Sequence, residues 1–148
     1  MFPALICGMV FTSCGSKIST DDNTLNDVVL TLSDGHTLNL ESMQWLDKLI
    51  YLSKTDVTMN YFGRIWLDTF MGQDIFVTDM MLGSGGVKYY FFDTSGASII
   101  VKGHEQYHNP FIEAFAGKGY AFVEVDKEDL DNYNQYKINL DVVVYSSY

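Results

Sequence analysis

The sequence predicts an α+β fold, in which a mainly antiparallel sheet of seven or eight strands is packed by one principal helix and one short helix. Three observations support this prediction. Short runs of alternating apolar and polar residues recur along most of the chain, as expected for strands with one buried face. Asp-Gly and Ser-Gly pairs lie between several of these runs and favour tight hairpin turns. Only one stretch has helical spacing of apolar residues over several turns. The 148 residues are enough for one domain with a substantial core.

The first predicted elements are a β-hairpin and the principal helix. Residues 28–32 and 36–40 alternate apolar and polar side chains on either side of a turn at Gly35, where glycine accepts a positive φ. The following stretch predicts a helix over about residues 42–53, with Ser42 able to cap its first turn. Its apolar residues repeat at helical spacing: Trp45, Leu46, Leu49 and Ile50.

Most of the remaining chain is predicted to form strands. One hairpin turns at Gly72-Gln73 and the next at Thr94-Ser95-Gly96, because in each case glycine lies between two apolar runs. Pro110 favours the start of a short helix over about residues 110–116, since proline fits the first helical turn. The strands are predicted over residues 61–71, 74–82, 87–93, 97–102, 120–126 and 136–145. In the last of these, alternate residues from Tyr136 to Val144 are expected to share one face.

An acidic stretch follows the strand predicted at 120–126. Its carboxylates come from Glu124, Asp126, Glu128, Asp129 and Asp131. A calcium loop needs alternate oxygen ligands, a mid-loop glycine and a closing glutamate, and this stretch lacks the last two features. We therefore expect a solvated strand end and turn.

Residues 1–13 predict a targeting segment that precedes the folded domain. They carry no charged side chain, and the apolar run from Phe2 to Phe11 is shorter than the roughly 20 residues that a membrane-spanning helix needs. The small residues Thr12 and Ser13 follow the run, and Cys14 comes next. An apolar run that ends in small residues is typical of a secretory signal and its cleavage site.

The segment Phe11-Thr12-Ser13-Cys14-Gly15 resembles the lipobox of bacterial lipoproteins, and its residue order is most similar to the Bacteroidota type. The resemblance implies cleavage before Cys14, acylation of this residue and attachment to the outer membrane of the bacterial cell envelope, facing the periplasm or the cell surface. Residues 1–13 are then the signal segment, residues 14–26 the anchor and a flexible tether, and residues 27–148 a single α+β domain. Because Cys7 and Cys14 are the only cysteines, this domain would hold no disulfide and no reactive thiolate.

A second resemblance covers about residues 43–101. Trp45-Leu46 in the predicted helix is followed by Phe70-Met71-Gly72-Gln73-Asp74 and by Phe92-Asp93-Thr94-Ser95-Gly96. This order is similar to that of small Bacteroidota lipoprotein domains of unknown function. The resemblance implies a location and a style of fold, and it implies no activity.

Charge and aromatic content narrow the partners that the chain can bind. A net charge of −10 argues against unaided nucleic-acid binding, because phosphate contacts need clustered Lys and Arg. Aromatic residues make up 15% of the chain, and Tyr89, Tyr90, Phe91 and Phe92 are consecutive. Neighbours on a strand face opposite sides, so either both faces are covered or one pair is exposed. The first arrangement is an aromatic core, and the second favours a protein, peptide or glycan partner.

The residues His104-Glu105-Gln106-Tyr107-His108 match the H-E-x-x-H pattern, and they resemble the zinc site of metallopeptidases. On a helix, His104 and His108 would bind zinc, and Glu105 would act as base on the bound water. Glu124 or Glu128 is available as a third ligand.

The flanking residues argue against a catalytic helix at this motif. Gly103 precedes it and Asn109-Pro110 ends it, and a residue before proline avoids helical geometry. We therefore expect a polar loop, no catalytic residue and no cofactor. The predicted function is a lipid-anchored, non-catalytic envelope domain that binds a protein, peptide or glycan. A zinc-dependent hydrolase built on His104, Glu105 and His108 is the alternative.

Overall fold

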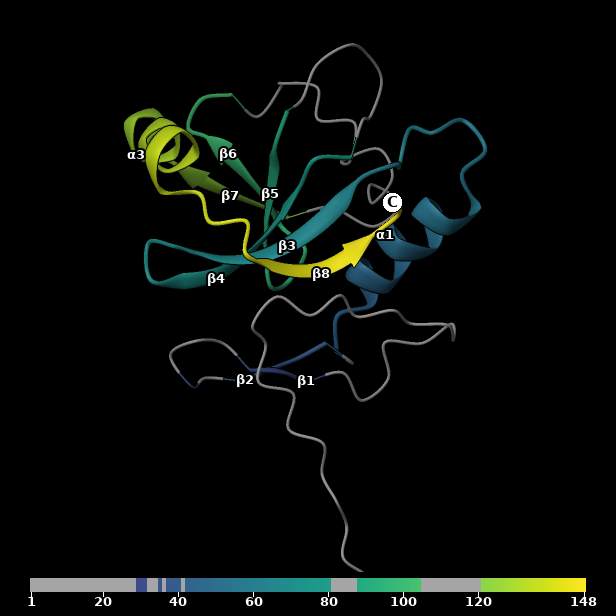
Figure 1. Cartoon of the computed structure of the whole chain (residues 1–148). Helices are drawn as coiled ribbons and strands as arrows, with labels where there is room; N and C mark the ends of the chain where they lie inside the picture. The colour runs from purple at the N-terminus through teal and green to yellow at the C-terminus, as the bar shows by residue number, and fades with distance from the viewer. Residues whose placement is uncertain (1–28, 32–34, 36, 41, 81–87, 105–120) are drawn as a thin grey trace, which may run out of the picture.

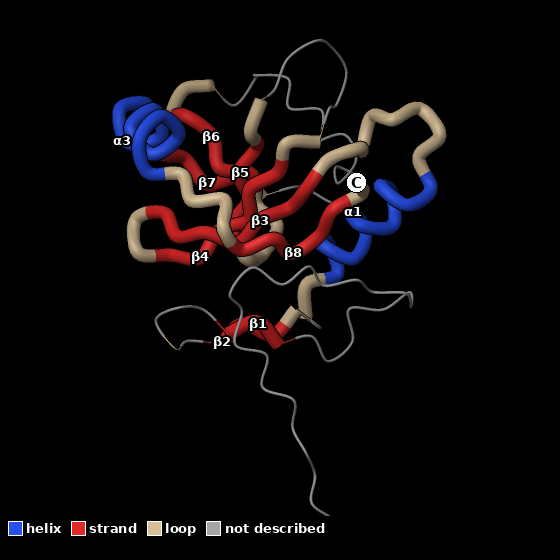
Figure 2. Tube along the Cα trace, viewed as in Figure 1, coloured by secondary structure: helices blue, strands red, loops and turns tan. Residues whose placement is uncertain are grey.

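The computed structural model describes residues 29–31, 35, 37–40, 42–80, 88–104 and 121–148. Across these residues the fold is α+β, with a six-stranded and mostly antiparallel sheet, a separate two-stranded hairpin and two α-helices (Figure 1). The elements are β1 (Val29–Thr31), β2 (Thr37–Asn39), α1 (Gln44–Thr55), β3 (Arg64–Phe70), β4 (Gln73–Thr78), β5 (Tyr90–Asp93), β6 (Ser98–Val101), β7 (Phe122–Val125), α3 (Lys127–Asn132), the π-helical turn η2 (Tyr133–Lys137) and β8 (Val142–Ser146). Figure 2 shows the same view with helices in blue and strands in red.

The strands of the large sheet follow the order β7-β6-β5-β4-β3-β8. All neighbouring pairs are antiparallel except β6 and β7, which run parallel with Ser98 opposite Phe122. The eight described strands thus divide into a sheet of six and a hairpin of two. The short helix predicted at 110–116 falls between β6 and β7 and lies outside the described residues.

The first predicted hairpin is confirmed. Strands β1 and β2 pair antiparallel, and Gly35 has a φ of 86°. The principal helix is also confirmed, although α1 begins at Gln44 and the predicted capping role of Ser42 is wrong. Met43 occupies the N-cap position, and its amide donates to the carbonyl of Leu40 at 3.0 Å. Leu40 and Met43 are both buried, so apolar packing places the start of α1 without a side-chain cap.

The two hairpins of the large sheet also form as predicted. The β3–β4 turn is centred on Met71 and Gly72, one residue earlier than expected, with φ angles of 50° and 75°. Two consecutive positive φ angles are the signature of a type I′ turn, whose twist matches the flanking strands. In the β5–β6 turn, Oδ1 of Asp93 accepts hydrogen bonds from the amides of Ser95 and Ala97, both at 2.9 Å.

The strand predicted at 136–145 is wrong over its first half. The structure begins β8 at Val142, and Tyr133–Lys137 is the turn η2 that continues α3. The acidic stretch is also more ordered than expected, because Lys127–Asn132 forms α3. Ile138 packs on one face of the sheet, whereas Val142 packs on the other. The chain therefore passes from one face of the sheet to the other between Ile138 and Val142, and the alternating residues do not share one face.

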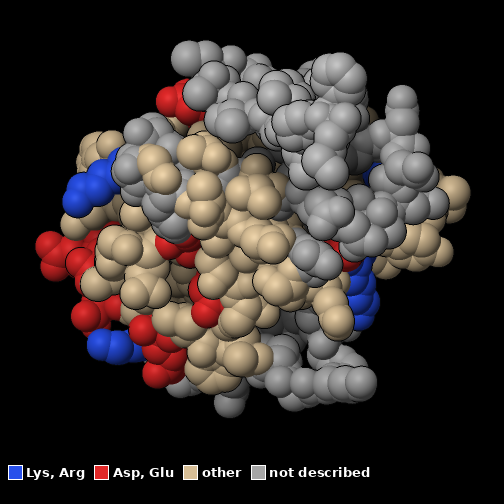
Figure 3. Space-filling model, turned by 90° about the horizontal axis from the view of Figure 1, so that it is seen from below, with Lys and Arg blue, Asp and Glu red and all other residues tan. Residues whose placement is uncertain are grey.

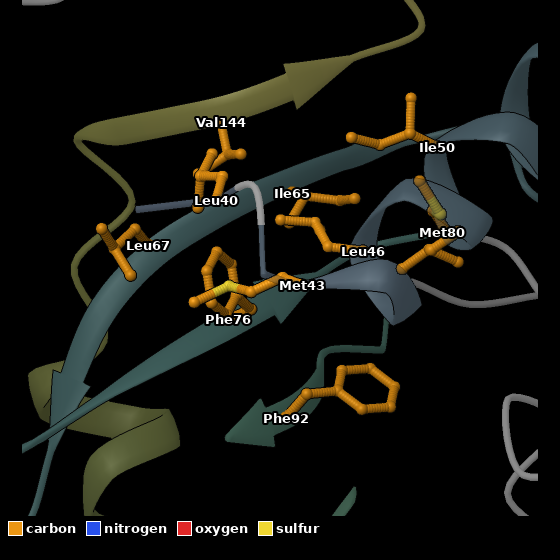
Figure 4. Packing of buried hydrophobic residues seen from close by; sticks show 11 residues of the cluster. Leu40, Met43, Leu46, Ile50, Ile65, Leu67, Phe76, Met80, Phe92 and Val144 are labelled. Carbon is orange, nitrogen blue, oxygen red and sulfur yellow. The ribbon is translucent and has the colours of Figure 1, made fainter. Parts of the chain in front are cut away.

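The large sheet separates two hydrophobic clusters. The first lies between the sheet and α1, and Figure 4 shows how residues such as Leu46, Ile65 and Phe76 converge in it. The second lies on the opposite face, where Tyr133 of η2 packs against Phe70 and Phe91. In register, Trp66 lies opposite Val143 and Ile65 opposite Tyr145, so Val144 is an extra residue at a β-bulge. The second face of the sheet is thus covered by α3 and η2.

Candidate functional site

The four aromatic residues singled out in the sequence divide between the core and the surface. Phe91 and Phe92 are 6% and 2% exposed, and they belong to the two clusters on opposite faces of the sheet. They are therefore core residues. Tyr89 and Tyr90 are half-buried, so only these two of the four reach the surface.

Tyr89 and Tyr90 contact different partners. The ring of Tyr89 meets the ring of Trp66 edge-on, with centroids 6.1 Å apart. The Nζ of Lys88 lies 5.2 Å from the ring centroid of Tyr90. Burial raises the pKa of the Tyr90 hydroxyl above its ordinary value, so this hydroxyl is neutral at pH 7.

Trp45 of α1 packs against the turn formed by residues 92–96. The indole Nε1 of Trp45 donates to the carbonyl of Thr94 at 3.0 Å, and its ring packs 5.5 Å from that of Phe92. A Cβ at Gly96 would lie 2.5 Å from Cγ of Trp45, so only glycine leaves room for the indole. These residues, which carried the second resemblance, therefore join α1 to the β5–β6 turn.

A cluster at one end of the large sheet combines a partly exposed cation with several aromatic rings. Its centre is Arg64, the only arginine of the chain, with a side chain that is 45% exposed. The guanidinium carbon lies 5.0 Å from the ring centroid of Trp66 and 5.0 Å from that of Tyr148. Tyr148 in turn meets the ring of Phe62 at 4.5 Å. We call Phe62, Arg64, Trp66, Tyr89 and Tyr148 the arginine–aromatic cluster.

Hydrogen bonds fix Arg64 at both ends. Its amide donates to Oδ1 of Asp79 at 2.6 Å, and its Nη2 donates to Oδ2 of the same carboxylate at 3.1 Å. Its carbonyl accepts from Oγ1 of Thr78 at 2.8 Å. Asp79 is largely buried, with 9% of its side chain exposed. The pair holds the guanidinium in one orientation while leaving its outer side in solvent.

The segment that carries Tyr148 is fastened to the same end of the sheet. The amide of Gly63 donates to Oγ of Ser147 at 2.8 Å, and the amide of Ser147 donates to the carbonyl of Gly63 at 3.0 Å. A Cβ at Gly63 would lie 2.8 Å from both Oδ1 of Asp79 and the Cα of Met80. Glycine thus allows three segments to meet beneath the cluster.

A hydrogen-bonded group around Tyr133 connects η2 to the sheet. The Tyr133 hydroxyl donates to Oδ2 of Asp68, which also accepts the amide of Asn139 at 2.8 Å. Burial, followed by the hydrogen bond and charge of Asp68, raises the pKa of this hydroxyl far above its usual range. The proton therefore stays on the Tyr133 oxygen, and its hydrogen bond to Asp68 fastens η2 to β3.

The surface charge is unevenly distributed. Most Asp and Glu side chains visible in Figure 3 gather on the side where α3 and the β3–β4 turn lie. Lys102 pairs with Asp126 at 3.0 Å, and Lys127 pairs with Asp131, four residues along α3. These pairs are exposed and contribute little to stability.

The structure places only part of the candidate zinc motif and none of the lipobox. His104 follows β6 and is exposed, with its amide donating to the carbonyl of Val101 at 3.0 Å. Glu105, His108 and Cys14 lie outside the described residues. Glu124 and Glu128 are exposed on β7 and α3. Over the ranges that the structure describes, no group of three or more His, Cys, Asp or Glu side chains is arranged to hold a metal ion.

Comparison with known proteins adds no relative: no protein-family model, curated protein or solved structure matches this chain. No helix within the described ranges has the length and apolar character needed to cross a membrane. Arg64 and Tyr148 were not predicted as site residues from the sequence. One sequence signal could have pointed to Arg64, because it is a lone arginine two residues before a tryptophan on a predicted strand. No sequence signal pointed to Tyr148, because it reaches the cluster only through the pairing of β8 with β3.

Proposed function

We propose that this chain is a lipid-anchored, non-catalytic domain of the bacterial envelope that binds a protein, peptide or glycan through the arginine–aromatic cluster. The observation that carries the proposed binding is the partly exposed Arg64 guanidinium, which lies 5.0 Å from the ring centroids of both Trp66 and Tyr148. The proposed anchor rests on the resemblance of residues 11–15 to a lipobox. Arginine and aromatic side chains dominate the energetics of many recognition surfaces. A side chain that is already fixed loses little conformational entropy when a partner binds.

The cluster offers two kinds of contact side by side. The planar guanidinium has five N–H donors, of which one Nη2 bond is used by Asp79, so its fork can bind a carbonyl or carboxylate oxygen. The ring of Tyr148 is 64% exposed and offers an apolar surface for a sugar ring or a peptide side chain. This combination supports binding rather than bond cleavage as the activity.

The partner surface is tested by capture from the native envelope. Beads carrying the chain are expected to retain a component that beads carrying Arg64→Ala or Tyr148→Ala retain at least roughly tenfold less. Tyr136→Ala is the matched control, since Tyr136 is 78% exposed and lies on η2. Protease or glycosidase treatment of the extract separates a protein from a glycan partner. Equal capture by all variants would exclude the cluster as the binding surface.

The anchor is tested separately. We expect the wild-type chain to stay in the membrane fraction after an alkaline carbonate wash, which removes peripherally bound proteins but leaves acylated ones. Cys14→Ala is expected to be washed off, because a chain without acyl groups has no permanent hold on the bilayer. Retention of Cys14→Ala after the wash would contradict the lipid anchor without bearing on the arginine–aromatic cluster.

A further inference from the structure

The loop that follows α1 exposes large apolar side chains. Val57 is 93% exposed and Met59 is 58% exposed, and both lie in the short connection between α1 and β3. Tyr51 on the last turns of α1 is 63% exposed. On the other side, Tyr148 packs against Phe62 at the end of this loop. In Figure 1 the loop projects from the body of the molecule beyond the end of α1.

Internal hydrogen bonds hold this loop in shape. Oδ1 of Asp56 accepts the amide of Thr58 at 2.8 Å and its hydroxyl at 2.5 Å. Oδ2 of Asp56 accepts the amide of Tyr61 at 2.7 Å. These bonds, led by the Thr58 hydroxyl, lower the pKa of the Asp56 carboxyl below 3.8. The hydrogen bonds of Asp56 therefore hold the loop in shape at neutral pH, while Val57 and Met59 stay largely in solvent.

Met59 is in a conformation that its side chain does not favour. Its φ is 64°, in the left-handed region where glycine and asparagine are common and long side chains are rare. Because Met59 is 58% exposed, its burial offsets little of this unfavourable backbone conformation. Sparsely populated backbone conformations of this kind concentrate at functional sites.

The local charge differs from that of the whole chain. Between residues 54 and 64 the charged residues are Lys54, Asp56 and Arg64, and Asp79 pairs with Arg64, so positive and negative charges balance around the loop. The carboxylate of Asp56 is occupied by three hydrogen bonds within the loop. The chain as a whole carries a net charge of −10, and most of the Asp and Glu side chains visible in Figure 3 lie on the side of α3.

We propose that the α1–β3 loop binds the surface of a lipid bilayer by inserting Val57 and Met59 among the upper acyl chains. The exposed side chain of Tyr51 suits the headgroup level, where an aromatic ring and a hydroxyl are both accommodated. Lys54 lies close enough in sequence to reach lipid phosphates, and the acidic side of the molecule faces away from an anionic surface. This contact goes beyond the proposed partner binding and does not depend on acylation of Cys14.

The insertion is tested with unacylated Cys14→Ala chain and vesicles of phosphatidylethanolamine and phosphatidylglycerol in a ratio of about 3 to 1. The double variant Val57→Ser/Met59→Asn is expected to lower vesicle binding by roughly tenfold or more, because two apolar side chains leave the membrane. Asparagine at position 59 preserves the left-handed conformation, so the loop keeps its backbone shape. The control is Met71→Asn, an exposed methionine with a φ of 50° in the β3–β4 turn.

A second measurement reports insertion even if residues 1–13 also bind vesicles. A tryptophan at Val57→Trp is expected to be quenched by brominated acyl chains well above the background of the native Trp45 and Trp66. Tyr136→Trp, on the exposed η2, is expected to stay at that background. Equal quenching at both sites, no quenching at position 57, or unchanged vesicle binding by the double variant would overturn the proposal. Self-association that depends on Val57 and Met59, without vesicle binding, would assign the loop to a protein contact instead.

Discussion

At Gly96 a missing Cβ decides how two distant segments meet. The Cβ of an alanine at this position would lie 2.5 Å from Cγ of Trp45, and the φ of 86° is unfavourable for any residue with a Cβ. We expect Gly96→Ala to lower the free energy of unfolding by about 2–4 kcal/mol, from steric overlap and backbone strain together. Urea unfolding followed by tryptophan fluorescence measures the change.

Gly72 provides the matched control for Gly96. It also has a positive φ, 75°, but a Cβ added there would have no atom within 4 Å. Gly72→Ala therefore carries backbone strain alone, and we expect a loss of about 1 kcal/mol. Equal losses for the two variants would show that contact with Trp45 is not what requires glycine at position 96.

Single residues were predictable where their role is local. Gly35 and Gly96 were expected in turns because their neighbours along the chain show the pattern, and both have positive φ. Ser42 was misjudged because its capping role competes with the burial of Leu40 and Met43, which sequence spacing does not weigh. Arg64 was missed because its neighbours Asp79 and Tyr148 come together only through sheet pairing.

At the scale of elements, η2 is held to the sheet by Tyr133. Its ring lies between those of Phe70 and Phe91, at 5.0 Å and 5.5 Å, and its hydroxyl bonds to Asp68. Tyr133→Phe keeps the ring contacts and removes the hydrogen bond to a charged group. We expect a loss of about 1.5–3 kcal/mol in the free energy of unfolding at neutral pH, measured by urea denaturation. An unchanged midpoint would mean that the ring alone holds η2.

The same substitution changes the response to alkaline pH. The pKa of Tyr133 is raised above 10.0 in the folded chain, so the folded state holds this proton more tightly than the unfolded state. Stability from this difference is complete below pH 10 and decreases as the pH rises above it. Between about pH 8 and about pH 11 we expect wild type to lose more stability than Tyr133→Phe. The other tyrosines are common to both chains, and an equal loss in both would contradict the assignment.

Elements were predictable when their partners are adjacent along the chain. The β1–β2, β3–β4 and β5–β6 hairpins each pair across a short turn whose residues signal it. The parallel pairing of β6 and β7 has no such local signal, because it depends on distant parts of the chain. The helical α3–η2 segment was missed for a similar reason: its apolar residues are few, and Tyr133 gains its burial from β3 and β5.

At the scale of the whole molecule, one sheet serves two hydrophobic clusters. Phe91 and Phe92 are adjacent but belong to opposite clusters. Because both clusters share the same strands, we expect Phe91→Leu and Phe92→Leu each to lower stability by about 1–2 kcal/mol in a single transition. Urea unfolding with two probes checks this, with an unchanged m value. Separate transitions for the two variants would show that the faces unfold independently.

The fold class was predictable because alternation and turn signals repeat along the chain. The division into two clusters was not, because Tyr89–Phe92 allowed both a covered and an exposed face. In the structure the side chains of Phe91 and Phe92 are buried on opposite faces of the sheet, and only Tyr89 and Tyr90 of the four reach the surface. The arginine–aromatic cluster was not predictable, because its residues come together only through the pairing of β3 with β4 and β8.

The pairing of β3 with β8 has a consequence for the timing of folding. Ile65 pairs with Tyr145, and Leu67 pairs with Val142. The hydrophobic cluster between the sheet and α1 is therefore completed only when β8 has been synthesised, long after β3. Contacts between distant parts of a chain form slowly, and a nascent chain lacking them stays open. Such a chain is still unfolded enough to pass through a translocation channel. The proposed export, which precedes acylation at Cys14, requires this.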